Sequence, residues 1–479
     1  MPLTILSQEQ LRSLLLSLSR DQIVSLQENL ARALRDYSTG SQEKGCAATY
    51  QPQRTAITRP DGCTTVFMPA STGPTLGMKV ISLQDKNSQV GCTVDAASKI
   101  SPSDRTGVAQ IDKRKSLASI ASDVSELSLS SQEGTSTSNS LTMTNSGGSG
   151  SGSSSSKSLA AGCVNQQPVA GGLSKTMGAW PSAGSRDTSP QGSVTLLDGN
   201  SLPFGLINAH ELTPFRTALT SLMTLNKRKR VRTIVVFGAG KQAYWHIRLA
   251  LVLRSADVKR VYIINRSFDR AAQLLRDIYS PENSSWRGDV KFSAVSSDFV
   301  EYPRILHDAL RKADAIFCCT PAVDPLFPAE ILTAREGRQK GRLISAIGSY
   351  KPHMTELPPD LLRDEVSVHT PGHRHFHKHI KRSGVVVVDS LDAALKEAGE
   401  IVQAGIKPHQ VVELGELLIV RESSHGDADS DDHKSLREWV ERGNVIFKSV
   451  GMGLMDLVTG GDLIQLAREK NIGTTIAEF

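Results

Sequence analysis

The stretch from residue 231 to residue 267 constrains the fold of this chain more than any other. It begins with an apolar run at residues 233–237, passes through a glycine turn into a helix expected at residues 241–253, and reaches a second apolar run at residues 261–264. Apolar runs of this length are typical of strands buried on both faces of a parallel sheet. The stretch therefore predicts a βαβ unit with a dinucleotide-binding turn.

The turn itself reads Gly238-Ala239-Gly240-Lys241-Gln242-Ala243, which fits the GxGxxA fingerprint. Gly238 would permit the tight turn, Gly240 would let backbone N–H groups approach a pyrophosphate, and Ala243 would let the helix pack closely on the sheet. The positive N-terminal end of the helix would face the phosphates. The alternative is a glycine turn in an α/β protein that binds no nucleotide.

The end of the second strand bears on the choice of cofactor. NAD enzymes usually carry an acid there, which bonds the ribose 2′-hydroxyl. Here the chain reads Asn265-Arg266-Ser267, and the first acid is Asp269. Because an arginine can pair with a 2′-phosphate and a serine hydroxyl can donate to it, the sequence favours NADP(H) over NAD(H). The alternative is that Arg266 is a solvated loop charge.

Composition divides the remaining chain. The 479 residues suggest two domains plus disordered length. Residues 85–191 are rich in Ser, Gly and Thr, and we expect them to form a disordered insertion because they can bury too little apolar surface. The net charge of +6 is spread along the chain except for a basic run at residues 227–232. We expect this run to be a solvated loop rather than a nucleic-acid patch or import signal.

Several classes of protein are disfavoured. The six cysteines are irregularly spaced and form no CxxC pair, which indicates a reducing compartment. No signal peptide and no membrane-spanning run is recognisable, so we expect a cytoplasmic protein with no membrane partner.

Alternating histidines at residues 373–379 match no metal motif, so we interpret them as a solvated loop and expect no metal site. Residues 427–432 are expected to form a solvated acidic loop.

Strands and helices alternate after the glycine turn, which predicts an α/β fold with a doubly wound parallel Rossmann sheet over residues 229–404. Hairpins around residues 53–69 and 193–208 indicate a second, α+β domain. This domain would consist of residues 1–84 and 192–228, with residues 405–479 returning to it as a tail.

The sequence also predicts two further helices and the residues at the ligand-binding edge of the sheet. One helix is expected to begin near Thr213, with Pro214 in its first turn, and another to cover residues 391–402. Ligands of doubly wound sheets bind at the carboxyl ends of the strands. The residues expected at these ends are Thr320, Pro321, Gly348, Ser349 and Ser390.

Motifs spread along nearly all of the ordered chain resemble those of the ornithine cyclodeaminase/μ-crystallin family. The matching stretches are Arg54 with Met68-Pro69-Ala70, Gly77-Met78-Lys79, residues 197–200 to Arg216-Thr217-Ala218, Gly238-Ala239-Gly240-Lys241-Gln242-Ala243 with Trp245-His246, residues 346–350, Val388-Asp389-Ser390 with residues 397–400, residues 414–416, and residues 447–451. They occur in the family's order, and the set is specific although single members are not.

This resemblance implies a Rossmann domain and a substrate-binding and dimerisation domain, in a protein that acts on small α-amino or α-imino acids with a nicotinamide cofactor as a homodimer. It implies a substrate site of Arg54, Lys79 and Arg216, together with Met68 and Gly451. Thr217 and Ser449 are expected at the cofactor, with Thr217 touching its phosphates or the substrate.

The chemistry of the three basic residues agrees with this site, since two guanidiniums suit a substrate carboxylate. A lysine buried beside them would have its pKa lowered towards a useful value for proton transfer to nitrogen, although Lys79 could instead be a snorkelling strand lysine.

Two departures separate the chain from ornithine cyclodeaminases proper. The family pattern implies a Glu where this chain has Val66, and an Asp where it has Tyr350. Those acids would receive the δ-ammonium of ornithine, which Val66 and Tyr350 cannot do. The expected function is therefore an NAD(P)H-dependent ketimine reductase or amino-acid dehydrogenase. The alternatives are ornithine cyclodeaminase, which forms proline and ammonia, and a non-catalytic binder of NADPH and a small ligand.

Overall fold

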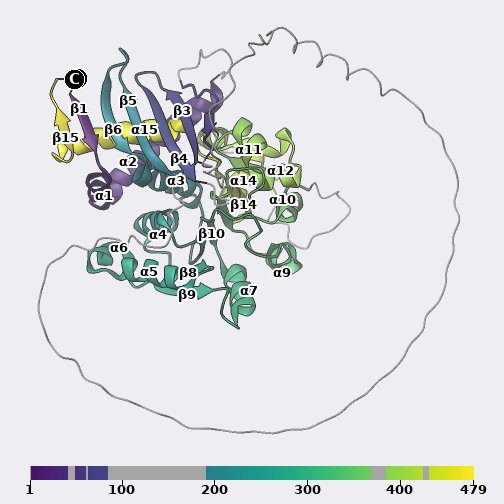
Figure 1. Ribbon diagram of the computed structural model, residues 1–479. Coiled ribbons are helices and arrows are strands. Elements are labelled where there is room, and N and C mark those ends of the chain that lie inside the picture. The colour runs from purple at the N-terminus through teal and green to yellow at the C-terminus, as the bar shows by residue number, and fades with distance from the viewer. Residues whose placement is uncertain are drawn as a thin grey trace, which may run out of the picture. The chain divides into compact units, whose positions relative to one another are not determined.

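The computed structural model describes residues 2–40, 49–60, 63–84, 190–367, 385–423 and 431–478, which form two sheets and the helices packed on them (Figure 1). Several predicted features lie outside these described residues. They are residues 85–189 of the insertion, the turn at residues 61–62, the histidine-rich loop and residues 427–430 of the acidic loop.

The first sheet has eight strands, in the order β13-β12-β14-β11-β10-β7-β8-β9, and every neighbouring pair is parallel. The strands are β7 (Thr233–Phe237), β8 (Arg260–Asn265), β9 (Lys291–Ser296), β10 (Ala315–Cys318), β11 (Leu343–Ala346), β12 (Val386–Val388), β13 (Val411–Glu413) and β14 (Val445–Lys448). The chain moves outwards from β7 to β8 and β9, then returns to place β10 on the other side. This reversal is the position at which doubly wound sheets bind dinucleotides, and the predicted fold class is confirmed.

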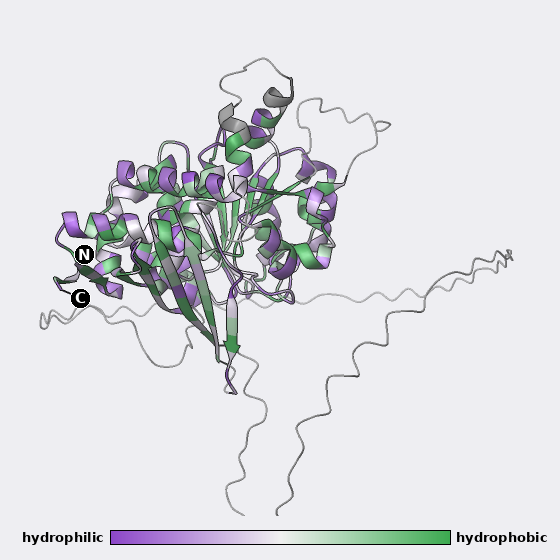
Figure 2. Cartoon of the chain, turned by 90° about the horizontal axis from the view of Figure 1, so that it is seen from above, coloured by the Kyte–Doolittle hydropathy of each residue, from purple (hydrophilic) through white to green (hydrophobic). Residues whose placement is uncertain are grey.

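Helices cover both faces of this sheet. They are α4 (Lys241–Arg254), α5 (Phe268–Tyr279), α6 (Ser284–Arg287), α7 (Tyr302–Lys312), α8 (Glu330–Thr333), α9 (Arg335–Arg338), α10 (Pro359–Val366), α11 (Leu391–Glu397), α12 (Gly399–Ala404), α13 (Leu414–Ser423) and α14 (Asp431–Arg442), with short 3-10 turns at Pro281–Asn283 and Pro408–Gln410. The two faces bury separate apolar clusters. Accordingly, the strands are mostly apolar and the covering helices carry hydrophilic residues outside (Figure 2).

The second sheet has seven strands, in the order β15-β1-β6-β5-β4-β3-β2. The strands are β1 (Leu3–Leu6), β2 (Thr55–Thr58), β3 (Cys63–Ser71), β4 (Leu76–Gln84), β5 (Gln191–Leu197), β6 (Pro203–Asn208) and β15 (Thr474–Ile476). Only β1 and β6 pair in parallel. Both predicted hairpins are present. β4 and β5 pair directly although the long insertion separates them in sequence, so the sheet is continuous across the insertion point.

Four helices pack against this sheet or between the sheets: α1 (Gln8–Leu16), α2 (Arg20–Thr39), α3 (Ala209–Leu225) and α15 (Gly453–Glu469). Ser7 and Gln10 form a capping box at the start of α1. Helix α15 crosses β3 to β6, and α3 is buried along almost its whole length. These helices bring polar residues from distant parts of the chain to the boundary between the two sheets.

Helix α3 begins earlier than the sequence suggested. Asn208 caps it by accepting from the N–H of Glu211 at 3.2 Å, so Pro214 lies inside the helix rather than in its first turn. Proline removes one helical donor, and the side chains of Thr213 and Thr217 bond the carbonyls of Ala209 and Thr213 here. This longer helix places Arg216 and Thr217 in its middle, where their side chains are fixed.

The helix expected over residues 391–402 is broken at Ala398, whose backbone is extended. Gly399 explains the break, because a Cβ there would lie 1.6 Å from the carbonyl oxygen of Met354. The break starts a new helix whose second residue, Glu400, is fully buried.

The expected domain boundary at residues 404 and 405 is wrong. Strands β13 and β14 belong to the Rossmann sheet, where β14 pairs with both β11 and β12. All four residues of β14 are buried, as a strand covered on both faces requires. Among the described residues after 404, α15 and β15 contact the second sheet, and the segment that follows β14 lines the Rossmann crevice.

Candidate active site

A cavity of about 300 Å³ lies at the carboxyl edge of the Rossmann strands, and the second sheet and α3 form its other wall. Its lining residues are Arg54, Val66, Met68, Lys79, Ile81, Leu83, Pro190, His210, Thr213, Pro214, Arg216, Thr217, Gly238, Ala239, Gly240, Lys241, Gln242, Asn265, Arg270, Cys319, Thr320, Pro321, Ile347, Gly348, Tyr350, Ser449, Val450 and Gly451. Five of these are Lys or Arg, and no described lining residue is Asp or Glu. The cavity therefore suits anionic ligands.

The glycine turn forms the Rossmann side of the cavity. Gly238 has φ +106°, and a Cβ there would lie 2.8 Å from the carbonyl oxygen of Cys319. Gly240 caps α4, and a Cβ there would meet nothing within 4 Å. Gly238 is thus required by the fold, whereas Gly240 faces open space at the positive end of a helix. That arrangement fits a pyrophosphate.

Lys79 lies at the centre of the opposite wall and is almost fully buried. Its amine donates to Thr213 Oγ1 at 2.8 Å and to the two carboxylate oxygens of Asp456 at 2.9 and 3.0 Å. Arg216 also pairs with Asp456, at 3.2 Å. Its Nε is buried without a hydrogen-bond partner among the described residues, and the side chain lines the cavity. An unsatisfied buried donor of this kind suits a ligand acceptor.

Burial lowers the pKa of Lys79 to about 8. Asp456 opposes this shift, while the positive charges of Arg216 and Arg54 add to it. The predicted direction is therefore confirmed, but the stabilising carboxylate was missed. Asp456 is fully buried in an otherwise apolar turn of α15, and an acid flanked by Met455 and Leu457 is the signal that could have revealed it.

Arg54 reaches the same cavity from the segment before β2. Its guanidinium donates to the carbonyl of Gly451 at 3.3 Å, and its Nε pairs with Glu397 at 3.2 Å. Gly451 has φ +90°, and a Cβ there would lie 3.0 Å from the guanidinium of Arg216. Gly451 thus lies between the two arginines, and the three predicted basic residues line one cavity with the glycine turn.

Buried Asp389 shapes the segment after β14. Its carboxylate accepts the Ser449 hydroxyl at 2.7 Å and the backbone N–H groups of Val450 and Gly451 at 3.1 and 2.7 Å. The sequence instead predicts Ser390 at the cofactor. Ser390 does not line the cavity, because its hydroxyl caps α11 and contacts the Tyr37 hydroxyl at 3.1 Å.

Four other residues expected at the cofactor also do not line the cavity. Ala243 is buried against the apolar core, as its packing role requires. Ser349 donates to buried Glu400. Arg266 is exposed at the end of β8, and Ser267 caps α5. Arg270, in the first turn of α5, lines the cavity in their place.

A buried polar network supports the cavity from behind. Glu356 accepts from the backbone N–H groups of Thr320 and Gly348, at 2.7 and 2.6 Å. Burial raises its pKa to about 8, with neighbouring Glu400 adding to the shift and Lys448 opposing it. Lys448 itself pairs with Glu400 at 3.3 Å. Glu356 thus holds two predicted cofactor residues in place without entering the cavity.

The two departures from the cyclodeaminase pattern both face the cavity, since Val66 and Tyr350 line it. The predicted partners of an ornithine ammonium are therefore absent from these positions.

Fold and cavity together define a class of protein. It is a Rossmann-type dinucleotide-binding protein whose second sheet carries basic residues that suit an anionic ligand. No family model matches the chain. It is 27% identical to a Delta(1)-pyrroline-2-carboxylate reductase of Bacillus cereus over 57% of this chain and 70% of that protein. It is 26% identical to the ketimine reductase mu-crystallin of Mus musculus over 56% of this chain and 67% of that protein.

Among solved structures, the Thermococcus litoralis Delta(1)-pyrroline-2-carboxylate reductase in complex with NADH and L-proline has the same fold. The match has a TM-score of 0.57 at 17% identity, and covers 99% of this chain and 100% of that one. The chain is thus a homologue of proteins named as reductases of cyclic imines, and its resemblance to the ornithine cyclodeaminase/μ-crystallin family is confirmed.

Proposed function

We propose that this protein reduces the C=N bond of a small cyclic imino acid with a nicotinamide cofactor, or oxidises the corresponding amino acid. The observation that carries this proposal is the shared cavity of Lys79, Arg54 and Arg216 with the glycine turn. The names of the relatives from Bacillus cereus and Mus musculus support the same substrate class.

The basic residues take separate roles in this reaction. The guanidiniums of Arg54 and Arg216 bind the substrate carboxylate, and the Nε of Arg216 gains an acceptor when they do. The bound cofactor supplies the hydride that the imine carbon receives. With a pKa of about 8, Lys79 is mostly protonated at neutral pH and can give its proton to the imine nitrogen. Asp456 forms ion pairs with both Lys79 and Arg216 and so fixes the positions of their side chains relative to each other.

For the cofactor we propose NADP(H) in preference to NAD(H). The end of β8 offers Asn265 to the cavity and the first turn of α5 offers Arg270, and no described carboxylate lines it. A 2′-phosphate would meet a guanidinium there and no acid to repel it. Arg266, exposed beside this position, adds positive charge.

The two alternative functions are less well supported. Ornithine cyclodeamination needs an acceptor for the δ-ammonium, and the cavity presents Val66 and Tyr350 where the family pattern has acids. A non-catalytic binder would not need a buried lysine with a pKa near neutrality.

We also propose a cytoplasmic homodimer. The second sheet exposes the apolar side chains of Leu76 and Met78, 38% and 40% accessible, which a second copy could cover. Cys318 and Cys319 form no disulfide among the described residues, which suits a reducing compartment. No helix in the described ranges is both long and apolar enough to cross a membrane. Light scattering after size exclusion measures the oligomeric state directly.

The proposed function is tested by mixing the purified chain with NADPH and either Δ1-pyrroline-2-carboxylate or Δ1-piperideine-2-carboxylate. We expect loss of nicotinamide absorbance with at least one imine, and slower loss with NADH. Release of ammonia from ornithine without net cofactor reduction would support the cyclodeaminase alternative. Cofactor binding without turnover on a panel of cyclic imines would support the binder.

A further inference from the structure

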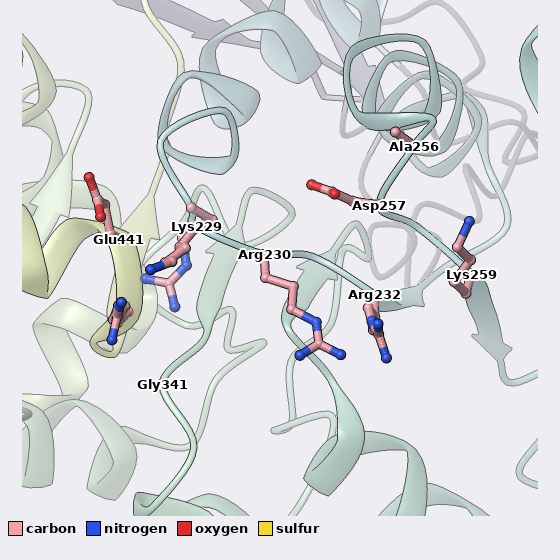
Figure 3. Close-up of a pocket in the computed structure, with 10 residues that line it drawn as sticks. Lys229, Arg230, Arg232, Ala256, Asp257, Lys259, Gly341 and Glu441 are labelled. Carbon is pink, nitrogen blue, oxygen red and sulfur yellow. The ribbon is translucent and has the colours of Figure 1, made fainter.

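A cluster of positive charge outside the active site surrounds a second cavity, of about 640 Å³ (Figure 3). Its lining residues are Arg228, Lys229, Arg230, Arg232, Ala256, Asp257, Lys259, Gly341, Glu441 and Arg442. Six of the ten are Lys or Arg and two are acids. We refer to these ten residues as the basic cleft.

The basic cleft lies at the opposite edge of the Rossmann sheet from the active site. Arg232 immediately precedes β7 and Lys259 precedes β8, while Gly341 and Arg442 lie just before β11 and β14. Because all these strands are parallel, their first residues meet at one edge and their last residues at the other. The cleft is therefore a separate site rather than an extension of the cofactor cavity.

The walls of the cleft are fixed by backbone contacts. The N–H of Lys229 donates to the carbonyl of Glu441 at 3.1 Å, and that of Lys259 donates to the carbonyl of Arg232 at 2.8 Å. A Cβ on Gly341 would lie 1.6 Å from the carbonyl oxygen of Arg442, so the two segments are in close contact. A cavity with such walls is preorganised for a ligand.

Basic residues outnumber acids in the cleft by six to two, although Glu441 attracts the charge of Arg228. In the part of the chain that the structure describes, none of the six basic side chains has an ion-pair partner. Asp257 instead pairs with Arg254, which lies outside the cleft. Figure 3 shows the side chains of Arg230 and Arg232 extending in a similar direction. Like charges that line one cavity favour binding of an anion.

Arg228 provides an independent indication of a ligand. Its side chain is only 5% exposed, yet it lines the cleft. One terminal nitrogen donates to the carbonyl of Val440 at 2.9 Å, while the Nε is buried with no hydrogen-bond partner among the described residues. Burial lowers the pKa of Arg228 to about 10, so it remains charged at neutral pH. A buried guanidinium with an unused donor needs an acceptor from outside.

We propose that the basic cleft binds a compact anion with two or more phosphate groups. Guanidinium forks match phosphate oxygens in pairs, and the cleft offers four guanidiniums and two amines. Its volume lies within the usual range for small-molecule sites, about 300–1,000 Å³. None of the described residues that line the cleft is aromatic, so they provide no stacking platform of the kind with which proteins bind single-stranded nucleic acids.

Calorimetric titration of the full chain with tripolyphosphate tests this proposal. The protein is first saturated with NADH or NADPH, whichever binds, so that the probe cannot occupy the glycine turn. We expect one site per chain. Citrate and inorganic phosphate, at equal ionic strength, should bind at least about tenfold more weakly than tripolyphosphate, because each would lose at least one charged contact. Equal binding of citrate, or no heat with tripolyphosphate, would overturn the proposal.

The variant Arg230→Glu/Arg232→Glu changes two exposed residues of the cleft and leaves the active site intact. We expect it to weaken tripolyphosphate binding by about 100-fold or more, because two charged contacts are lost. The control Arg20→Glu/Arg335→Glu changes the net charge equally at exposed positions outside the cleft. If both variants bound tripolyphosphate equally weakly, binding would depend on the overall charge of the protein and not on the cleft. If a single-stranded oligonucleotide bound as tightly per phosphate as tripolyphosphate does, the cleft would be a nucleic-acid surface. Equal weakening in the two variants, or this oligonucleotide result, would contradict a small-anion site.

Discussion

The carboxylate of Asp456 lies 2.9 Å from the amine of Lys79, although 377 residues separate them in sequence. The two side chains are almost completely buried, and Asp456 also pairs with Arg216. One carboxylate from α15 therefore holds both the proposed proton donor and a proposed carboxylate-binding arginine. The chemistry of the site depends on this connection between the C-terminal helix and the second sheet.

We predict that Asp456→Asn shifts the pH dependence of imine reduction. In the wild type, the rate should fall as pH rises through about 8, because Lys79 then loses the proton that it donates. Asp456 raises the pKa of Lys79, so its removal should move this fall to lower pH by about 1 unit or more. Profiles of kcat/KM measure the shift. The control Asp462→Asn changes a half-buried acid of the same helix, and an unshifted Asp456→Asn profile would refute the proton-donor role.

The glycine turn offers a matched pair of variants. Gly238→Ala should destabilise the fold by about 1–3 kcal/mol, because it combines a positive φ with a Cβ 2.8 Å from a carbonyl oxygen. Gly240→Ala meets no protein atom within 4 Å, so its melting temperature should stay close to that of the wild type. Its affinity for the cofactor should nevertheless fall. Unchanged affinity in Gly240→Ala would exclude close approach of the phosphates at this residue.

Glu356 should make stability depend on pH. Its folded pKa of about 8 lies above the ordinary value of 4.5, so the folded chain binds an extra proton between these values. Stability should therefore decrease as pH rises from about 4.5 to 8. The variant Glu356→Gln, which cannot titrate, should flatten this dependence in thermal melts. An equal slope in both proteins would assign the effect to other groups.

Arg270 should determine the preference for NADPH. Arg270→Glu places an acid beside the proposed 2′-phosphate site, and we expect the KM for NADPH to rise about 10-fold to 100-fold with little change for NADH. Arg304→Glu, on an exposed helix position, provides a charge-matched control. If NADPH and NADH were affected equally, the 2′-phosphate would not lie at this residue.

The sequence was sufficient to predict the elements around the glycine turn. Alternating apolar runs and helices follow local periodicity, and residues 54, 79 and 216 were identified from motifs. Asp456, Asp389 and Glu356 were not identified, because each acts through residues distant in sequence. Ser349 and Ser390 were assigned to the cofactor from their place after strands, but their hydroxyls are used by Glu400 and Tyr37. Strand ends predict an edge of the sheet, not the direction in which each side chain points.

Boundaries were harder to predict where a tertiary contact overrides a local pattern. The helix at residues 391–402 is interrupted because Gly399 packs against the backbone of Met354. Strand β14 was assigned to the tail because sequence order alone could not show that it pairs with β11 and β12. The basic run at residues 227–232 is predicted to be a solvated loop, whereas Arg228 within it is buried.

Lys79→Ala tests the central claim most directly. With Δ1-pyrroline-2-carboxylate and NADPH, we expect kcat to fall by about 100-fold to 10,000-fold, the usual contribution of a general acid. The dissociation constant of NADPH should stay unchanged, because Lys79 lies on the wall opposite the glycine turn, and the exposed control Lys407→Ala should retain full activity. A Lys79→Ala protein that binds NADPH normally and turns over at the wild-type rate would contradict the account.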